Sequence, residues 1–326
     1  MKKEIGGYLE LEEFSGSEYY PDLYKVNLGR TALIWLLHSR NCKKLLLPDF
    51  LCDSVIDACL KTDAEISFYA LDQNLNPTID RPHGLLEGEY LYLVNYYGQL
   101  TDHHILQYRE KYERIIIDHT HAFYQRPLAG IDTLYSCRKF FGLSDGAYLA
   151  TDAALTDLPE TDHSNTRMTH ILGRYEQDAG AYYQQMLQNA STYHEETPKY
   201  MSRLTRNLLR GIDYQQIKFK REANYMTLHK NLQGGNREKN PFIAVIPEGP
   251  FAYPYYSSQG ILLRKELAKY KIFVPTNWTN VLKSLPEGRR EYQWAANILP
   301  LPCDQRYSKE EMEYMVKIIQ EVEKRL

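Results

Sequence analysis

Short apolar runs alternate with helix-like segments through the first half of this chain of 326 residues. The expected strands cover 44–47, 65–70, 90–94, 114–118 and 131–136, and the expected helices cover 30–39, 50–60 and 102–112. Continuous apolar strands separated by helices are typical of a mostly parallel sheet that is covered on both faces. Such folds bind ligands beyond the carboxyl ends of their strands. The pattern therefore predicts an α/β fold with a site at those strand ends.

Two of the expected strands lead into residues that can do chemistry. The strand 114–118 ends in Asp118, and the strand 131–136 is followed closely by Lys139. A carboxylate and an amine in these places are what pyridoxal phosphate (PLP) chemistry requires. The amine forms a Schiff base, and the carboxylate keeps the pyridine nitrogen protonated so that the ring can accept electrons. We therefore predict a PLP site with Lys139 and Asp118 as its catalytic residues.

Both residues also have plain structural explanations. Asp118 could cap the segment that follows it, and Lys139 could be a surface lysine beside Arg138. The surrounding sequence favours the chemical interpretation, because an apolar strand precedes the lysine and Phe140-Phe141 follow it. Apolar surroundings lower the pKa of an amine and so favour the neutral form that imine chemistry needs. His121, which is close to Asp118 in sequence, is a second candidate for a contact with the ring.

A glycine turn near the N-terminus offers a place for a phosphate group. Gly29-Arg30-Thr31 opens the expected helix 30–39, whose free amides and positive dipole end suit an anion, and the Thr31 hydroxyl could add a hydrogen bond. In isolation, such a turn is more often only a turn with a helix cap. Together with the lysine and the carboxylate, it supports a PLP enzyme.

Five short motifs follow one another in a fixed order between residues 29 and 146. They are Gly29 to Leu33, Leu47 to Phe50, Val94 to Gln99, Ile117 to Ala122, and Ser136 to Lys139 with Asp145-Gly146. Their order and spacing resemble the DegT/DnrJ/EryC1/StrS family of PLP-dependent sugar aminotransferases, which have the aspartate aminotransferase fold (fold type I). No single motif is specific, but the five in order are. A fainter similarity returns at 221–225 and 298–302.

The resemblance implies a role for each matching residue. Lys139 would carry the cofactor and move protons, and Asp118 would pair with the pyridine nitrogen. His121 stands where the family usually has glutamine, near the phenolic oxygen of the ring. The contacts implied for the phosphate are Gly29, Arg30, Thr31 and Ser136. A sugar dehydratase branch of the family has histidine in place of the lysine, so Lys139 argues against that branch.

Further residues are predicted to form the walls of the site. Cys52 stands where the family usually has an aromatic residue on the cofactor face, so that either Cys52 covers this face or another residue such as Phe50 does. Tyr96 and Tyr97 follow the strand 90–94 and are predicted to contact the substrate. The stretch 164–167 resembles a segment that reaches the phosphate of a neighbouring subunit, and a solvated loop is the alternative.

The resemblance also implies a reaction. It is the transfer of an amino group from an amino-acid donor to a keto-sugar, which we expect to be nucleotide-linked and to serve surface-polysaccharide or related sugar biosynthesis. Because a second subunit completes the site in this fold, we expect a homodimer. Two alternatives stay open. One is another PLP-dependent reaction, such as an elimination or decarboxylation, and the other is a non-catalytic homologue of the fold.

The second half of the chain predicts a different organisation. Long helices are expected at 174–191, 199–209 and 219–232, and the last ends at a Gly234-Gly235-Asn236 turn. Strands are then expected at 242–246, 272–274 and 298–301, with helices at 257–270 and 309–324. We therefore expect a large PLP-binding domain (1–190), a helical connection (191–235) and a small C-terminal α+β domain (236–326). The large domain would hold a mostly parallel sheet of the seven-stranded type.

Composition narrows the possible partners. Charged residues make up 25% and the net charge is -3, which argues against a nucleic-acid or anionic-membrane partner. The 5 cysteines form no C-x-x-C pair, so we expect no metal and no disulfide framework. Neither a signal peptide nor an apolar run of about 18 residues is visible. We expect a cytoplasmic protein that acts on small molecules.

Overall fold

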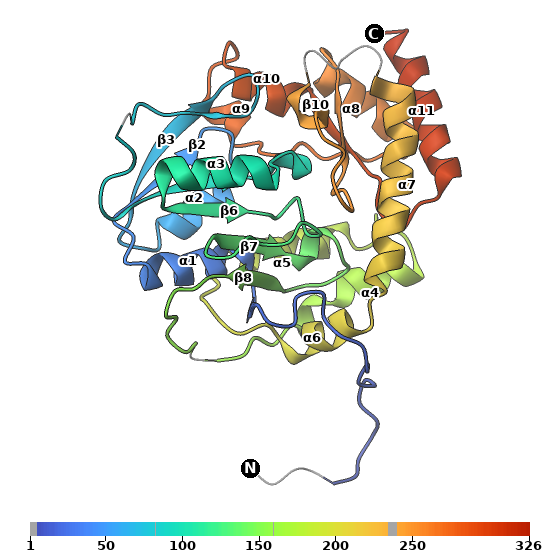
Figure 1. Cartoon of the computed structure of the whole chain (residues 1–326). Coiled ribbons are helices and arrows are strands. Elements are labelled where there is room, and N and C mark those ends of the chain that lie inside the picture. Colours follow the sequence, from blue (N-terminus) through green and yellow to red (C-terminus); the bar gives the residue numbers. More distant parts are fainter. Residues whose placement is uncertain (1–4, 82, 159, 234–239) are drawn as a thin grey trace.

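One large sheet forms the centre of the protein. The computed structural model describes residues 5–81, 83–158, 160–233 and 240–326 (Figure 1). The strand order of the sheet is β1-β8-β7-β6-β5-β2-β3-β4. Its parallel strands are β2 (Lys44–Pro48), β3 (Glu65–Leu71), β5 (Glu89–Val94), β6 (Ile115–Asp118) and β7 (Asp132–Ser136). The expected α/β fold with a mostly parallel sheet is therefore confirmed.

Antiparallel strands complete both edges of the sheet. β8 (Ala147–Ala150) pairs with β7 and with β1 (Tyr24–Val26), and β4 (Pro77–Thr78) pairs with β3. Within the described residues the sheet has 8 strands, where a sheet of the seven-stranded type was expected. The edge strands are short, which limits the unpaired backbone that they offer to other chains.

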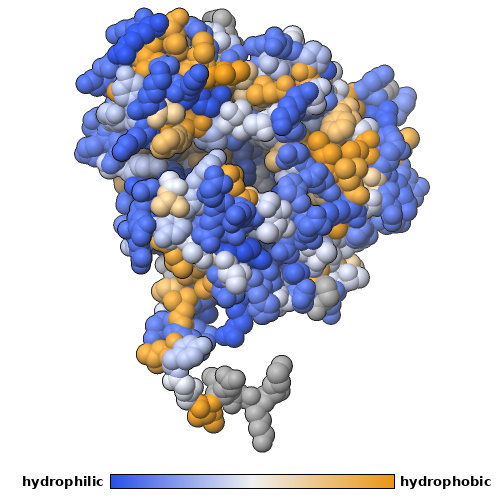
Figure 2. Space-filling view, turned by 180° about the vertical axis from the view of Figure 1, so that it is seen from behind, coloured by the Kyte–Doolittle hydropathy of each residue, from blue (hydrophilic) through white to orange (hydrophobic). Residues whose placement is uncertain are grey.

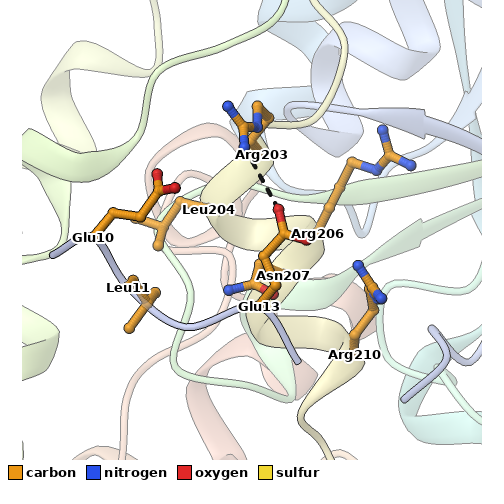
Figure 3. Close-up of a pocket in the computed structure, with 8 residues that line it drawn as sticks. All are labelled: Glu10, Leu11, Glu13, Arg203, Leu204, Arg206, Asn207 and Arg210. Carbon is orange, nitrogen blue, oxygen red and sulfur yellow. Dashed lines mark ion pairs between the residues drawn. The ribbon is translucent and has the colours of Figure 1, made fainter. Parts of the chain in front are cut away.

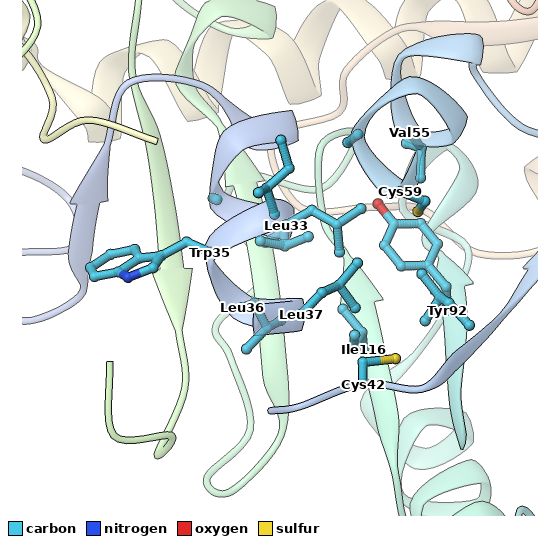
Figure 4. Close-up of a cluster of buried hydrophobic side chains, with 14 of the residues drawn as sticks. Leu33, Trp35, Leu36, Leu37, Cys42, Val55, Cys59, Tyr92 and Ile116 are labelled. Carbon is cyan, nitrogen blue, oxygen red and sulfur yellow. The ribbon is translucent and has the colours of Figure 1, made fainter. Parts of the chain in front are cut away.

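Two helices cover one face of the sheet. α1 (Gly29–Ser39) follows the expected bounds, whereas α2 (Asp53–Cys59) is shorter than the expected helix, because Cys52 has an extended backbone at its start. Leu33 and Leu37 of α1 pack beside Tyr92 and Ile116 of the sheet (Figure 4). Residues four apart lie on the same side of a helix, so this pair presents one apolar face to the strands.

The opposite face is covered by α3 (Asp102–Tyr112) and by segments from the C-terminal part. α3 has the expected bounds and begins after Thr101, whose hydroxyl accepts a hydrogen bond from the His104 amide. Ile105 of α3 belongs to the same buried cluster as Phe242 and Trp294. The C-terminal part therefore packs directly on the sheet.

The single long helix expected at 174–191 is wrong. α4 (Thr169–Glu176) and α5 (Tyr183–Thr192) form there, separated by a turn. The Asp178 carboxylate accepts hydrogen bonds from the amides of Gly180 (2.7 Å) and Ala181 (3.1 Å) in this turn. An aspartate that binds its own following backbone competes with the helix, and this explains the break.

The next two helices were expected, but their first residues differ from the expectation. α6 (Arg203–Arg210) begins after Ser202, which caps the Thr205 amide at 3.1 Å. α7 (Tyr214–Leu232) begins earlier than expected, because Asp213 caps the Gln216 amide at 2.9 Å. The expected turn at 234–236 lies outside the described residues.

A small second sheet and further helices form the C-terminal part. They are β9 (Tyr253–Tyr256), α8 (Gly260–Lys269), α9 (Val281–Ser284), α10 (Arg290–Asn297), β10 (Ile298–Leu301) and α11 (Lys309–Glu323). β9 pairs antiparallel with β10, and α11 packs beside α7 (Figure 1). The Ser308 amide donates to Glu311 at 2.7 Å, as the capping-box pattern at the start of α11 predicts. None of the described helices is both long and apolar enough to cross a membrane.

Two of the strands expected in this part are wrong. A 3-10 turn (Pro241–Ile243) replaces the strand 242–246, and Asn240 fixes it by accepting from the Phe242 amide at 3.1 Å. At 272–274, Ile272 and Val274 are buried and Phe273 is exposed, and the Ile272 amide donates to the Leu267 carbonyl oxygen of α8 instead of to a strand. In both places apolar residues are buried without a strand. The predicted domain boundaries stay a prediction.

One buried arginine joins segments that are far apart in the sequence. Arg221 of α7 is 2% exposed and donates to the carbonyl oxygens of Phe140 (3.0 Å) and Pro250 (2.9 Å). It also donates to the Gln305 side chain at 2.8 Å, and Gln305 donates to Phe140 at 2.8 Å. Buried guanidinium groups are tolerated where their donors are used in this way.

Candidate active site

Asp118 and Lys139 lie at the same edge of the sheet. Asp118 is the last residue of β6 and is paired in parallel register with Leu134 of β7. β7 ends at the half-buried Ser136 and leads at once into a 3-10 turn (Cys137–Lys139). Because parallel neighbours end on the same side, this connection brings the lysine to the strand end where the carboxylate lies.

The amine of Lys139 is held between an imidazole and an aromatic ring. Its Nζ lies 3.3 Å from His121 Nε2 and 5.4 Å from the centre of the Phe251 ring. The side chain keeps contact with solvent, but the protein around the amine removes enough water to lower its pKa. The nearby Cys52 and Asp118 act in the opposite direction without reversing it. A lowered pKa makes more of the neutral, nucleophilic amine available.

The Asp118 carboxylate is buried, with 5% exposure, and both of its oxygens are hydrogen-bonded. Oδ2 accepts from the Tyr92 hydroxyl at 2.9 Å, and Oδ1 accepts from the Thr120 amide at 2.9 Å. The capping role considered for Asp118 is thus present. A carboxylate has about four acceptor positions, so these two contacts leave capacity for a further donor.

An aromatic wall surrounds His121, and most of it comes from the C-terminal part. The Phe251 ring stacks on His121 at 4.2 Å with an angle of 12° between the planes. The rings of Tyr97 and Trp278 lie 5.2 Å and 5.6 Å away. Burial, and then the charge of Lys139, lower the pKa of His121 well below its ordinary value, so the imidazole is neutral near pH 7.

Phe251 and Trp278 were not predicted as site residues. They lie more than 100 positions after His121 in the sequence. No local pattern of residues marks them, since both resemble ordinary core aromatics. Only the packing of the C-terminal part on the sheet brings them to the strand ends.

The two predicted substrate residues are both enclosed by protein. Tyr96 packs against Phe50 and donates its hydroxyl hydrogen to the Phe50 carbonyl oxygen, an arrangement that does not support contact with a substrate. Tyr97 is also buried, and its hydroxyl accepts from Asn277 at 3.0 Å. It lies behind His121, so it supports the wall of the site instead of facing its opening.

The structure separates the two candidates for covering the cofactor face. Phe50 is fully buried and packs against Trp278 at 4.4 Å between ring centres. Cys52 is half-buried and lies near enough to Lys139 to affect the pKa of the amine. Its Sγ accepts from the Ser54 hydroxyl at 3.1 Å. Cys52 therefore acts on the Lys139 amine, and its place on the cofactor face stays a prediction.

Three of the residues predicted to bind phosphate, Gly29, Arg30 and Thr31, lie at the first turn of α1, whereas Ser136 lies at the end of β7. A Cβ atom added to Gly29 would meet nothing within 4 Å, so the space beside this residue is open. The Thr31 hydroxyl is buried and donates to Asn27 Oδ1 at 2.5 Å, so a phosphate would have to compete with Asn27 for it. The Arg30 side chain points toward the carbonyl oxygen of Tyr193, to which it donates at 3.3 Å.

The stretch considered as a contact to a neighbouring subunit is held within its own chain. Asn165 to Arg167 form a 3-10 turn. Arg167 makes ion pairs with Asp162 (2.5 Å) and Glu196 (3.4 Å). Because these carboxylates neutralise the guanidinium, Arg167 has little charge left to offer to an anion on another subunit.

A separate pocket lies at the N-terminal segment (Figure 3). It is lined by Glu10, Leu11, Glu13, Arg203, Leu204, Arg206, Asn207 and Arg210. None of these is a predicted site residue. Carboxylates and guanidinium groups face each other there, and Glu13 pairs with Arg203 at 3.7 Å. The pocket is therefore an exposed contact between the N-terminal segment and α6.

The fold is shared with solved structures of aminotransferases. Spr1654 from Streptococcus pneumoniae in its PMP form has a TM-score of 0.64 and 14% identity, over 93% of this chain and 86% of that chain. A DegT DnrJ EryC1 StrS aminotransferase from Brucella abortus has a TM-score of 0.62 and 13% identity, over 92% and 85%. The sugar aminotransferase CalS13 from Micromonospora echinospora has a TM-score of 0.60 and 13% identity, over 92% and 87%.

At these identities the likeness establishes the fold. The predicted fold type is confirmed. The neighbour from Brucella abortus carries the name of the family that the sequence resembles. No protein-family model matches the sequence, and no curated protein matches it.

The lowered pKa of Lys139 predicts its reactivity in the protein without any cofactor. Competitive labelling with acetic anhydride across a pH series, followed by peptide mapping, reports each lysine separately. We expect Lys139 to stay reactive at lower pH than the other surface lysines, because the protein around its amine favours the neutral form. A labelling profile of Lys139 that coincides with those of the surface lysines would contradict this prediction.

Proposed function

We propose that this protein is a PLP-dependent aminotransferase that moves an amino group from an amino-acid donor to a keto-sugar. The observation that carries the proposal is the Lys139 amine at the same sheet edge as the buried Asp118 carboxylate, in a fold shared with sugar aminotransferases. The amine contacts His121 and has a lowered pKa. This combination suits covalent attachment of an aldehyde cofactor.

The residues at the site fit PLP. Lys139 supplies the amine, and Asp118 has acceptor capacity left for the protonated pyridine nitrogen. The open space at Gly29, at the positive end of α1, suits a phosphate group. When bound, PLP supplies a ring that accepts electrons and stabilises negative charge on the α-carbon of an amino acid.

The residues of this chain then have distinct tasks. Lys139, as a neutral amine, accepts a proton and returns it at Nζ, for which a lowered pKa is favourable. His121 is neutral and keeps the amine in place through the 3.3 Å contact. Asp118 would hold a proton on the ring nitrogen of bound PLP by its charge. Phe251 and Trp278 limit the access of water to this side of the lysine.

The proposal also concerns the acceptor of the amino group. The neighbour from Micromonospora echinospora is a sugar aminotransferase, and the sequence motifs resemble a family of such enzymes. We therefore propose a keto-sugar, nucleotide-linked, as the acceptor, in a cytoplasmic pathway of surface-polysaccharide or related sugar biosynthesis. The domain division proposed for the chain is 1–190, 191–235 and 236–326.

We also propose a homodimer that forms through α4 and α5. Leu172 and Tyr175 of α4 are 58% and 93% exposed, and Tyr183 and Leu187 of α5 are 52% and 43% exposed. α5 has no fully buried residue. The surface in Figure 2 is largely hydrophilic, with apolar side chains gathered in a few patches. Large apolar side chains gathered on two neighbouring helices are typical of an interface.

The cofactor assignment predicts a covalent adduct. Protein mixed with PLP should gain a visible absorbance band, and borohydride should fix the cofactor to Lys139, as peptide mapping would show. Glutamate should convert the cofactor to its amino form. Lys139→Arg should lose the adduct, while Lys220→Arg, an exposed lysine of α7, should keep it. An adduct at another lysine, or no band at all, would overturn the assignment.

The role of Asp118 predicts a rate effect. Asp118→Asn keeps the size and an oxygen for the Thr120 amide, but it removes the charge that holds the ring proton. We expect the half-reaction with glutamate to slow by about a hundredfold or more in single-turnover measurements. Asp102→Asn, at the exposed start of α3, is the control. A near-normal rate in Asp118→Asn would mean that the carboxylate is only a cap.

The proposed interface predicts a change of assembly. Sedimentation velocity at micromolar concentration should show a dimer of the unaltered protein. Leu172→Glu combined with Leu187→Glu should give a monomer, because charges replace the apolar contact. Leu262→Glu, at a comparably exposed leucine of α8, should leave the dimer intact. A monomeric unaltered protein would refute the dimer, and a dimeric double variant would refute this interface.

A further inference from the structure

Arg138, the residue before Lys139, forms no ion pair with any described residue. Its guanidinium carbon lies 4.0 Å from the centre of the Tyr193 ring. Its Nε is buried and makes no hydrogen bond to any described residue. No ion pair within the described residues includes Arg138 or Arg30, whereas the nearby Arg167 is paired with two carboxylates. An enclosed arginine with an unused donor is costly unless an anion completes its surroundings.

Tyr193 holds Arg30 close to Arg138. The Tyr193 ring lies against Arg138, and its carbonyl oxygen accepts from Arg30 at 3.3 Å. The Tyr193 hydroxyl donates to the Ser144 carbonyl oxygen at 2.7 Å, which fixes the ring. Burial lowers the pKa of Arg138, and the charge of Arg30 acts in the same direction. Two like charges are therefore held near each other by one residue. The charge of Asp145 acts on the pKa of Arg138 in the opposite direction, but Asp145 forms no ion pair with either arginine.

We propose that Arg138 and Arg30 form a binding site for a phosphoryl group. The planar guanidinium fork matches phosphate oxygens, and two such groups suit a doubly charged anion. Arg30 lies in the first turn of α1, whose free amides favour an anion as well, and the space at Gly29 is open. The phosphoryl group could come from two sources, the phosphate of the cofactor and the diphosphate of a nucleotide-linked sugar. In naming these sources the proposal rests on the proposed function.

This site adds charged side chains to the phosphate contacts expected from the sequence. From the sequence, Arg30 was expected to bind phosphate through its backbone amide, and Arg138 was considered only as a neighbour of Lys139. In the structure the Thr31 hydroxyl is engaged with Asn27, so the uncommitted donors in this region are those of Arg138. An ion held by both arginines would lie beside the turn that carries Lys139.

The first test uses the protein without cofactor and does not depend on the proposed reaction. Inorganic phosphate should raise the melting temperature of the unaltered protein, and the rise should be lost in Arg138→Gln and in Arg30→Gln. Arg203→Gln, at an exposed arginine of α6, should keep it. If phosphate stabilises all of these proteins equally, or none of them, the site is refuted.

The second test separates the two sources of the phosphoryl group. Affinities for PLP and for pyridoxal, which lacks the phosphate, are measured by absorbance titration. If the cofactor phosphate occupies the site, Arg138→Gln should bind PLP about tenfold or more weakly and pyridoxal almost equally well. If the diphosphate occupies it, PLP binding should be unchanged, and uridine diphosphate should bind the PLP-loaded variant about tenfold more weakly.

The tests distinguish an error in the arginine site from an error in the proposed function. If Arg138→Gln binds both PLP and uridine diphosphate as tightly as the unaltered protein does, the arginine site is refuted, even if Lys139 carries the cofactor. Conversely, a phosphate effect without an adduct at Lys139 would keep the site and refute the aminotransferase. Arg30→Gln, a second variant at another place in the sequence, guards against misfolding of the Arg138 variant. Arg138→Lys, which keeps the charge but loses the fork, should show intermediate affinity.

Discussion

The parallel pairing of β6 with β7 is the constraint on which the candidate site depends. Ile116 and Ile117 of β6 are fully buried, and their pairing partners in β7 hold the two strands in one register. β6 is buried on both faces, so its register is set by the backbone pairing of Ile116 with Asp132 and of Ile117 with Thr133. With the register fixed, Asp118 ends one strand where the other leads into the turn that carries Lys139. The chemical pair is thus a consequence of this strand pairing.

A second constraint joins this edge to the C-terminal part. Arg221 and Gln305 both donate to the carbonyl oxygen of Phe140, the residue directly after Lys139. Arg221 also donates to Pro250, the residue directly before Phe251, whose ring stacks on His121. A buried guanidinium requires all of these acceptors, because an unused donor is costly. The lysine turn and the aromatic wall are therefore held in one arrangement by a single side chain.

Features that depend on a few neighbouring residues could be predicted from the sequence, and features that depend on contacts between distant segments could not. β5, β6, β7 and α3 were predicted closely, because their apolar runs and caps lie within a few residues. The same holds for Asp118 and Lys139, which mark strand ends. The strands expected at 242–246 and 272–274 were wrong. Phe242, Ile243, Ile272 and Val274 are buried there in turns and loops, whereas Ile246 and Phe273 are exposed. Phe251 and Trp278 were missed, since only contacts between distant segments bring them to the site.

The charges around Lys139 connect the cofactor site with the arginine pair. The protein around the amine lowers its pKa, and the charge of Arg138 acts in the same direction, whereas Asp118 opposes both. His121 adds no charge, because burial lowers its own pKa. An anion held by Arg138 cancels the repulsion that this arginine exerts on the amine, and so it raises the pKa of Lys139. Binding of a phosphoryl group and the basicity of Lys139 are thereby coupled, so that the lysine becomes a stronger proton acceptor when the arginine site is filled.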